Sequence, residues 1–264
     1  MKIFIGFDNN EAEAAKVCEY SLRKNSSSEL DIVFLNIHNL NFNRPLDPLQ
    51  SSEFTYTRFL VPYLCGYEGR ALFMDSDMIV LSDINELFGL YDPNYSIQVV
   101  KHDYVPTQQI KKGNKIQSAY HRKNWSSLMM MNCGDLKIWS KDYVEKSTGS
   151  DLHQFLGIRD DKIGAIPKNW NSLDIFESDT KILHFTSGGP WIKGCENHPE
   201  SYLWLQYWKD MYKDGIRSVL SAYDWNNIDS NVFFKWCENK RKQDISPDKI
   251  SFVEFVRETL SKLL

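Results

Sequence analysis

The chain has 264 residues, of which 42% are hydrophobic and 25% are charged, a composition typical of a globular protein with one sizeable domain. Its 31 Lys and Arg against 35 Asp and Glu give a formal net charge of −4. This balance argues against a nucleic-acid-binding protein, because binding to phosphates needs a basic surface.

In the first half of the chain, short apolar runs alternate with segments of helical periodicity. Residues 2–7 predict a strand, and residues 11–25 predict a helix with Asn9 or Asn10 as its cap. The elements predicted after these are strand 31–37, loop 38–54, helix 55–65, strand 70–81, helical turn 83–88, strand 96–100, loop 101–124, strand 126–133 and helical material over 134–146.

Strands that alternate with helices predict an α/β sandwich with helices on both faces of a sheet. From about residue 197 the sequence is helical and rich in Trp and Tyr, so we expect one main domain over 1–195 and a helical C-terminal appendage, 196–264, packed on it. Loop 101–124 is basic and without periodicity, which makes it a candidate lid.

The run RALFMDSDMIVL places Asp75 and Asp77 at the end of an apolar strand, where packing gives no reason for two carboxylates. Ligands of such sheets bind beyond the carboxyl ends of the strands. Two carboxylates about 6 Å apart repel by about 3 kcal/mol at an effective dielectric constant near 20, so we expect a counter-ion. Oxygen ligands favour Mg²⁺ or Mn²⁺, ions that usually also contact substrate phosphates. The alternative is a solvated turn in which Asp77 or Asp83 caps the next helix.

A second motif, HFTSGGPW, follows a short apolar run. Its histidine, His184, could complete a metal site, since imidazole suits Mn²⁺. The pair Gly188 and Gly189 lets backbone N–H groups approach an anion. Alone, a histidine in an apolar setting is usually structural and a glycine pair is usually a turn, but the combination favours a binding site.

Together these motifs identify a family. The DSD strand, with TYTRFLVPYL before it, LSDINELF after it and HFTSGGPW a hundred residues later, resembles the family 8 type of GT-A glycosyltransferases, which includes bacterial lipopolysaccharide galactosyl- and glucosyltransferases and glycogenins. The resemblance covers most of residues 1–195 and implies a GT-A fold, a Rossmann-like sandwich, for that catalytic domain. It also implies a Mn²⁺ or Mg²⁺ ion on a UDP-sugar, held by Asp75, Asp77 and His184.

The resemblance implies roles for further residues. Arg58 would reach the sugar or the diphosphate and steady Asp75, and the pair His153-Gln154 would lie beside the anomeric carbon. We therefore expect His153, Gln154 and Arg58 to be catalytic. The residues that would contact the UDP-sugar are Phe7, Asp8, Asn10, Arg58, Asp75, Ser76, Ser126, Ser127, Gly188, Gly189 and Lys193.

The sequence departs from the family pattern at two positions. His153 stands where the family has an acidic residue, so the residue beside the anomeric carbon differs in chemistry from the family pattern. SGGPW lacks the lysine expected before Pro-Trp, so the amides of Gly188 and Gly189, or Lys193, would have to neutralise the diphosphate.

The resemblance implies transfer of a hexose or deoxyhexose from a UDP-sugar to a hydroxyl of a glycan, with retention of anomeric configuration. Two alternatives stay open. One is a phosphatase of the haloacid-dehalogenase type, whose nucleophile also lies in a strand-end DxD; the other is a non-catalytic nucleotide-sugar-binding module.

The cellular compartment is predicted from the cysteine pattern and from the lack of targeting or membrane-spanning signals. The five cysteines are scattered and form no CxxC pair, which predicts buried thiols in a reducing compartment. The chain opens on a strand-like run and has no stretch of the roughly 18 apolar residues that a membrane span needs. We expect no signal peptide, no transmembrane segment and a cytoplasmic protein, with a peripheral position at a membrane left open.

Overall fold

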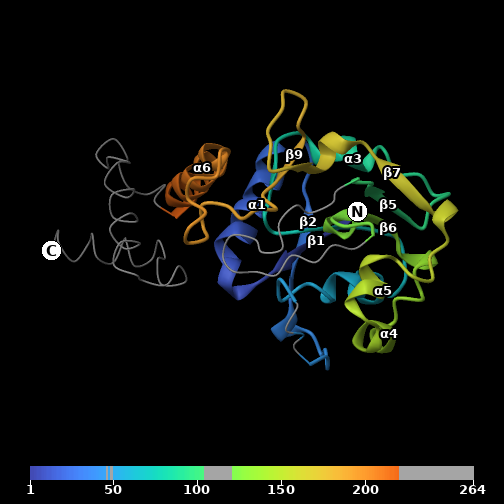
Figure 1. Cartoon of the computed structure of the whole chain (residues 1–264). Coiled ribbons are helices and arrows are strands. Elements are labelled where there is room, and N and C mark those ends of the chain that lie inside the picture. The colour runs from blue at the N-terminus through green and yellow to red at the C-terminus, as the bar shows by residue number, and fades with distance from the viewer. Residues whose placement is uncertain (46, 48–49, 104–120, 220–264) are drawn as a thin grey trace, which may run out of the picture. The chain divides into compact units, whose positions relative to one another are not determined.

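The structure is a computed structural model, and it describes residues 1–45, 47, 50–103 and 121–219 (Figure 1). The candidate lid falls largely, and the helices predicted beyond residue 219 fall entirely, outside the described residues. The chain divides into two units, Met1–Trp204 and Leu205–Leu264.

The first unit is built on a six-stranded sheet with the strand order β2-β1-β3-β6-β5-β7. Neighbouring strands are parallel except at β6, which is antiparallel to both β3 and β5. A smaller sheet has the order β4-β9-β8. The strands are β1 (Lys2–Phe7), β2 (Asp31–Asn36), β3 (Arg70–Met74), β4 (Met78–Val80), β5 (Ile97–Val100), β6 (Leu128–Asn132), β7 (Ile163–Ile166), β8 (Ser172–Leu173) and β9 (Ile182–His184).

Mostly short helices connect the strands. The α-helices are α1 (Ala12–Asn25), α2 (Val61–Leu64), α3 (Ile84–Phe88), α4 (Lys141–Lys146), α5 (Gly149–His153) and α6 (Ser201–Val219). The 3-10 helices are η1 (Asn9–Glu11), η2 (Ile37–Asn39), η3 (Thr57–Leu60), η4 (Trp125–Ser127), η5 (Cys133–Asp135), η6 (Asp160–Lys162) and η7 (Lys168–Asn171).

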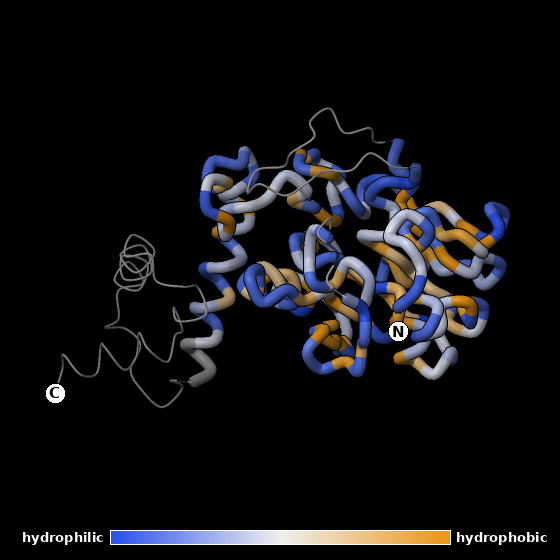
Figure 2. The backbone as a smooth tube through the Cα atoms, turned by 60° about the horizontal axis from the view of Figure 1, so that its bottom comes forward, coloured by the Kyte–Doolittle hydropathy of each residue, from blue (hydrophilic) through white to orange (hydrophobic). Residues whose placement is uncertain are grey.

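The strands of the large sheet bury both faces. Successive side chains of a strand point to opposite faces, so Leu72 and Met74 join one core with α1, while Ala71 and Phe73 join another with η3, α2, α4 and α5. Figure 2 shows hydrophobic stretches of backbone separated by hydrophilic ones along this unit. The predicted sandwich with helices on both faces is confirmed.

The stretch after Met74 differs from the prediction. We expected one strand over 70–81, but the chain forms two, β3 and β4, with Asp75, Ser76 and Asp77 between them. β4 belongs to the small sheet and pairs antiparallel with β9. Periodicity could not show this, because both halves of the run are equally apolar.

Candidate active site

The turn Asp75-Ser76-Asp77 is fixed by pairing on both of its sides. The Asp75 N–H donates to the Ser127 carbonyl at 2.9 Å, and the Phe185 N–H donates to the Asp77 carbonyl at 2.9 Å. In the small sheet Met78 is the partner of His184. Two segments more than a hundred residues apart in sequence therefore meet at this turn.

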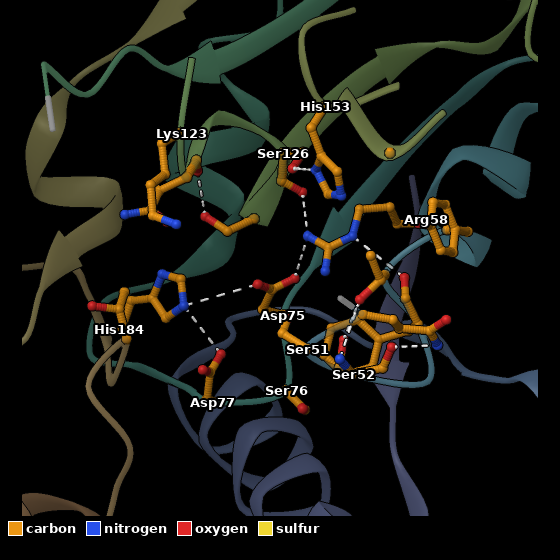
Figure 3. A pocket seen from close by; sticks show the side chains of 18 of the residues that line it. Ser51, Ser52, Arg58, Asp75, Ser76, Asp77, Lys123, Ser126, His153 and His184 are labelled. Carbon is orange, nitrogen blue, oxygen red and sulfur yellow. Dashed lines mark hydrogen bonds and ion pairs between the residues drawn. The ribbon is translucent and has the colours of Figure 1, made fainter. Parts of the chain in front are cut away.

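Asp75, Asp77 and His184 form one cluster, in which one ligand atom from each residue lies within 4.8 Å of the other two. The His184 Nε2 atom is 3.1 Å from Asp77 Oδ1 and 3.9 Å from Asp75 Oδ2 (Figure 3). Burial lowers the pKa of His184, but the Asp77 and Asp75 carboxylates outweigh it and raise that pKa above its ordinary value. Two carboxylates and an imidazole are a donor set that suits Mn²⁺ or Mg²⁺, so the residues fit a divalent cation.

The imidazole of His184 is oriented by a buried amide. Its Nδ1 atom lies 2.9 Å from Asn171 Oδ1, and Asn171 Nδ2 donates to Ser127 Oγ at 2.8 Å. A hydrogen bond from Nδ1–H to this carbonyl oxygen holds the ring with its Nε2 atom directed at the two aspartates. Metal-binding histidines are usually held by such a partner.

Arg58 is the buried cation beside the cluster. One guanidinium nitrogen, Nη1, lies 2.8 Å from Asp75 Oδ1 and donates to the Ser126 carbonyl at 2.9 Å. The guanidinium also lies over the rings of Phe54 and Phe73. The arginine thus fixes the position of the Asp75 carboxylate.

His153 lies on the other side of Arg58. Its Nδ1 atom is 2.7 Å from Ser126 Oγ, and its ring meets the Phe59 ring edge-on. Burial, followed by the nearby charges of Arg58 and Lys123, holds the pKa of His153 well below its usual value. At neutral pH this side chain is therefore an uncharged imidazole where the family has an acid.

These groups line one cavity of about 520 Å³. Four carboxylates face it, from Glu11, Asp47, Asp75 and Asp77, and two cations, from Arg58 and Lys123, among the residues that the structure describes. The lining is therefore formally negative and suits a divalent cation better than a bare anion.

Comparison with known proteins identifies the family of the chain that forms this cavity. The family model described as "Glycosyl transferase family 8" matches residues 10–193. The chain belongs to this glycosyltransferase family. It is 37% identical over 235 residues to Protein CDI of Arabidopsis thaliana, and the match covers 84% of this chain and 91% of that protein.

Solved structures show that the fold of this glycosyltransferase is the GT-A fold. The galactosyltransferase LgtC, solved with donor and acceptor sugar analogs, superposes with a TM-score of 0.57 at 14% identity over 80% of this chain and 96% of that one. The glycosyltransferase GlyE of Streptococcus pneumoniae has a TM-score of 0.55 at 17% identity over 83% of this chain and 63% of that one. No helix among the described residues is long and apolar enough to span a membrane.

The cavity of the glycosyltransferase brings together nine of the residues predicted for its site. They are Arg58, Asp75, Ser76, Asp77, Ser126, Ser127, His153, His184 and Gly188. Ser126 and Ser127 precede β6, and because this strand is reversed, its first end lies beside the last residue of β3. Gly188 has a φ of +90°, and a Cβ there would meet Cys195 Sγ at 2.9 Å, so only glycine fits well.

Six other predicted residues do not line the cavity: Phe7, Asp8, Asn10, Gln154, Gly189 and Lys193. The Asp8 carboxylate accepts hydrogen bonds from the Asn10 N–H and from the Glu53 N–H. The Gln154 amide donates to Ser150 Oγ at 2.5 Å, and Lys193 is exposed. A Cβ at Gly189 would collide with the Trp191 ring, so this glycine serves packing.

Two other parts of the lining were not predicted from the sequence. Segment 50–56 lies in and after a predicted loop, and Lys123 belongs to a basic stretch without periodicity. Lys123 is buried, with 7% of its surface exposed, and stands between two residues in the left-handed region, Arg122 (φ 64°) and Asn124 (φ 66°). This local reversal of the backbone, which no residue type announces, places the lysine in the cavity wall.

Proposed function

We propose that this glycosyltransferase moves a hexose or deoxyhexose from a UDP-sugar to a hydroxyl of a glycan, with Mn²⁺ or Mg²⁺ held by Asp75, Asp77 and His184. The observation that carries the proposal is the cluster of three ligand atoms within 4.8 Å inside a cavity of about 520 Å³. The galactosyltransferase that shares the fold was solved with donor and acceptor sugar analogs, which supports a sugar-nucleotide donor here.

The charges of the cavity explain why the cation is needed. An anionic donor that enters a lining with four carboxylates is repelled, and Arg58 is already paired with Asp75. Asp75, Asp77 and His184 would hold the cation, which when bound would supply Lewis-acid stabilisation of the leaving diphosphate. Arg58 and His184 keep the two carboxylates in place, so the ligand atoms need little rearrangement.

We propose that the reaction retains the anomeric configuration. Position 153 carries an imidazole whose Nδ1 atom is hydrogen-bonded to Ser126, so it offers no carboxylate for a glycosyl-enzyme intermediate. In the proposed mechanism the leaving phosphate takes the acceptor proton on the same face of the sugar. His153 orients the Ser126 hydroxyl in the cavity wall, and direct roles for Gln154 and Lys193 stay predictions.

The alternatives are weaker but testable. A phosphatase of the haloacid-dehalogenase type needs an aspartate free to attack, whereas Asp75 is paired with Arg58 at 2.8 Å, and the family match favours the transferase. A non-catalytic module would bind donor without turnover.

A donor screen tests the proposal. Thermal shift with a panel of UDP- and GDP-sugars, with Mn²⁺ or with a chelator, should give stabilisation by one or more UDP-sugars only when Mn²⁺ is present. NMR of the product's anomeric proton then reports retention or inversion. Binding of GDP-sugars alone would overturn the donor, and binding without transfer to any acceptor would favour the module.

A further inference from the structure

Two cysteines that are distant in sequence are brought together at the end of the large sheet opposite the cavity. Arg70, the first residue of β3, is paired with Asn132, the last residue of β6. The ladder continues by one hydrogen bond, from the Cys133 N–H to the Gly69 carbonyl at 3.1 Å. Cys133 is therefore fixed against the segment that enters β3.

The chain before β3 turns back sharply over this point. Gly66, Tyr67 and Gly69 all have left-handed φ angles, of 64°, 58° and 66°. The Glu68 N–H donates to the Cys65 carbonyl at 3.2 Å and closes the turn. This reversal turns Cys65, the residue after α2, back toward the core that contains Cys133.

The two cysteines pack into the same core and differ in exposure. Cys133 is fully buried in that core, whereas Cys65 is half-buried and packs against it. The neighbouring Cys133 thiol lowers the pKa of Cys65 to about 7, while Cys65 and burial raise the pKa of Cys133. Cys65 therefore has thiolate character near neutral pH and a second sulfur within reach.

The other described cysteines lack this arrangement. Cys18 and Cys195 are buried, and their sulfurs contact carbonyl oxygens, of Asp75 and Ser187 respectively. Burial raises the pKa of Cys18 well above its ordinary value. Reactivity toward peroxide follows thiolate character and access, so Cys65 should react first among these four.

We propose that Cys65 and Cys133 form a peroxide-oxidised dithiol site. The Cys65 thiolate attacks one oxygen of hydrogen peroxide, the O–O bond breaks, and a sulfenic acid and one water result once a proton is taken up. The Cys133 sulfur then attacks the Cys65 sulfur, an S–S bond forms, the S–O bond breaks, and a second water leaves with the Cys133 proton. Two thiols are oxidised and one peroxide is reduced to two waters.

The disulfide would cross-link segments 58–65 and 126–133 at their last residues. The first residues of the same two segments are already in contact. Arg58 lies just before α2 and Ser126 just before β6, and these two residues are hydrogen-bonded beside the cavity. The disulfide closes the loop from Cys65 to Cys133 and so restricts the unfolded chain. Oxidation should therefore raise the melting temperature by roughly 5 °C. The residues of the cavity are not changed.

The experiment treats the full chain with stoichiometric hydrogen peroxide and compares peptide maps before and after reduction. We expect one cross-linked peptide pair joining Cys65 to Cys133, loss of two hydrogens from the intact mass, the rise in melting temperature, and reversal of all three by dithiothreitol. A map in which both cysteines stay alkylatable while Cys18 or Cys195 is oxidised would overturn the proposal.

Single variants give the controls. C65S should abolish the cross-link, and C133A should leave Cys65 as a sulfenic acid that dimedone traps. C195S should behave as the wild type. If C133A fails to fold, C65S carries the test, because the side chain of Cys65 is half-buried. A disulfide between Cys133 and another cysteine in peroxide-treated C65S would overturn the assignment.

Discussion

Arg58 and Asp75 form a buried ion pair, with Nη1 and Oδ1 2.8 Å apart and only 6% and 14% of their side chains exposed. Removing one partner of such a pair leaves an uncompensated charge away from water. The pair connects η3 to the turn after β3, so it holds both the fold and the proposed metal ligand.

Replacement of Arg58 should separate these two effects. Arg58→Ala leaves the Asp75 carboxylate without its cation and should cost about 3–5 kcal/mol of unfolding free energy. Arg58→Lys keeps the charge but not the planar guanidinium, whose Nε atom also donates to the Phe54 carbonyl at 3.4 Å, so it should fold and lose transfer activity. Urea unfolding measures the stability and donor turnover the activity; full activity in the lysine variant would show that the guanidinium is not needed.

Asp77 should matter mainly for the cation. Asp77→Asn removes one of the two carboxylate ligands and should weaken Mn²⁺ binding roughly 100-fold. Isothermal titration calorimetry measures the Mn²⁺ affinity, and Asp142→Asn, a change at an exposed carboxylate, is the matched control. Unchanged Mn²⁺ affinity in Asp77→Asn would place the cation elsewhere.

Asn171 tests the orientation of His184. Asn171→Ala removes the acceptor of the Nδ1 hydrogen bond and should lower Mn²⁺ affinity about 10- to 100-fold, with the ligands themselves intact. Circular dichroism checks that the variant folds. Ser127→Ala removes the hydrogen-bond partner of the Asn171 amide. A similar loss of Mn²⁺ affinity in this variant would show that Ser127 also helps to orient His184. Unchanged Mn²⁺ affinity in both variants would mean that Asn171 serves only packing.

His153 predicts a pH effect on stability. Its pKa in the folded protein is lowered, so the unfolded chain binds a proton that the folded chain does not, and stability falls as pH drops below about 6.5, the ordinary pKa of histidine. His153→Gln should reduce that slope by up to about 1.4 kcal/mol per pH unit. His102, whose pKa burial lowers to about 4, contributes in the same direction and stays in the variant. Urea unfolding between pH 5 and pH 7 measures how the free energy of unfolding depends on pH in the wild type and in the variant. Equal slopes in the two proteins would mean that His153 is charged in the folded state.

Lys123 should assist binding of the anionic donor, because it and Arg58 are the two cations among the described residues of the cavity wall, and Arg58 is paired with Asp75. Lys123→Gln should weaken UDP binding in the presence of Mn²⁺ by roughly tenfold or more. Lys193→Gln, at the exposed position that the sequence suggested, should bind UDP as the wild type does. The opposite pattern would restore Lys193 to the site.

The sequence predicted the parts of the site that have a motif and missed those made by backbone geometry. Asp75, Asp77 and His184 could be found because carboxylates and a histidine after apolar strands have no packing role. Lys123 could not, since its place depends on the left-handed angles of its neighbours. The assignment of Asp8 to the nucleoside, made from its position after β1, stays a prediction; in the structure its carboxylate accepts from the Asn10 and Glu53 N–H groups and holds the turn there.

The reversed direction of β6 has a consequence for how this enzyme could diversify. In an all-parallel sheet, segments that follow the strands surround the ligand; here the segment that precedes β6 supplies Ser126 and Ser127. Insertions ahead of Leu128 would therefore alter substrate choice, whereas changes after Asn132 lie at the end of the strand away from Ser126 and Ser127 and would leave specificity untouched.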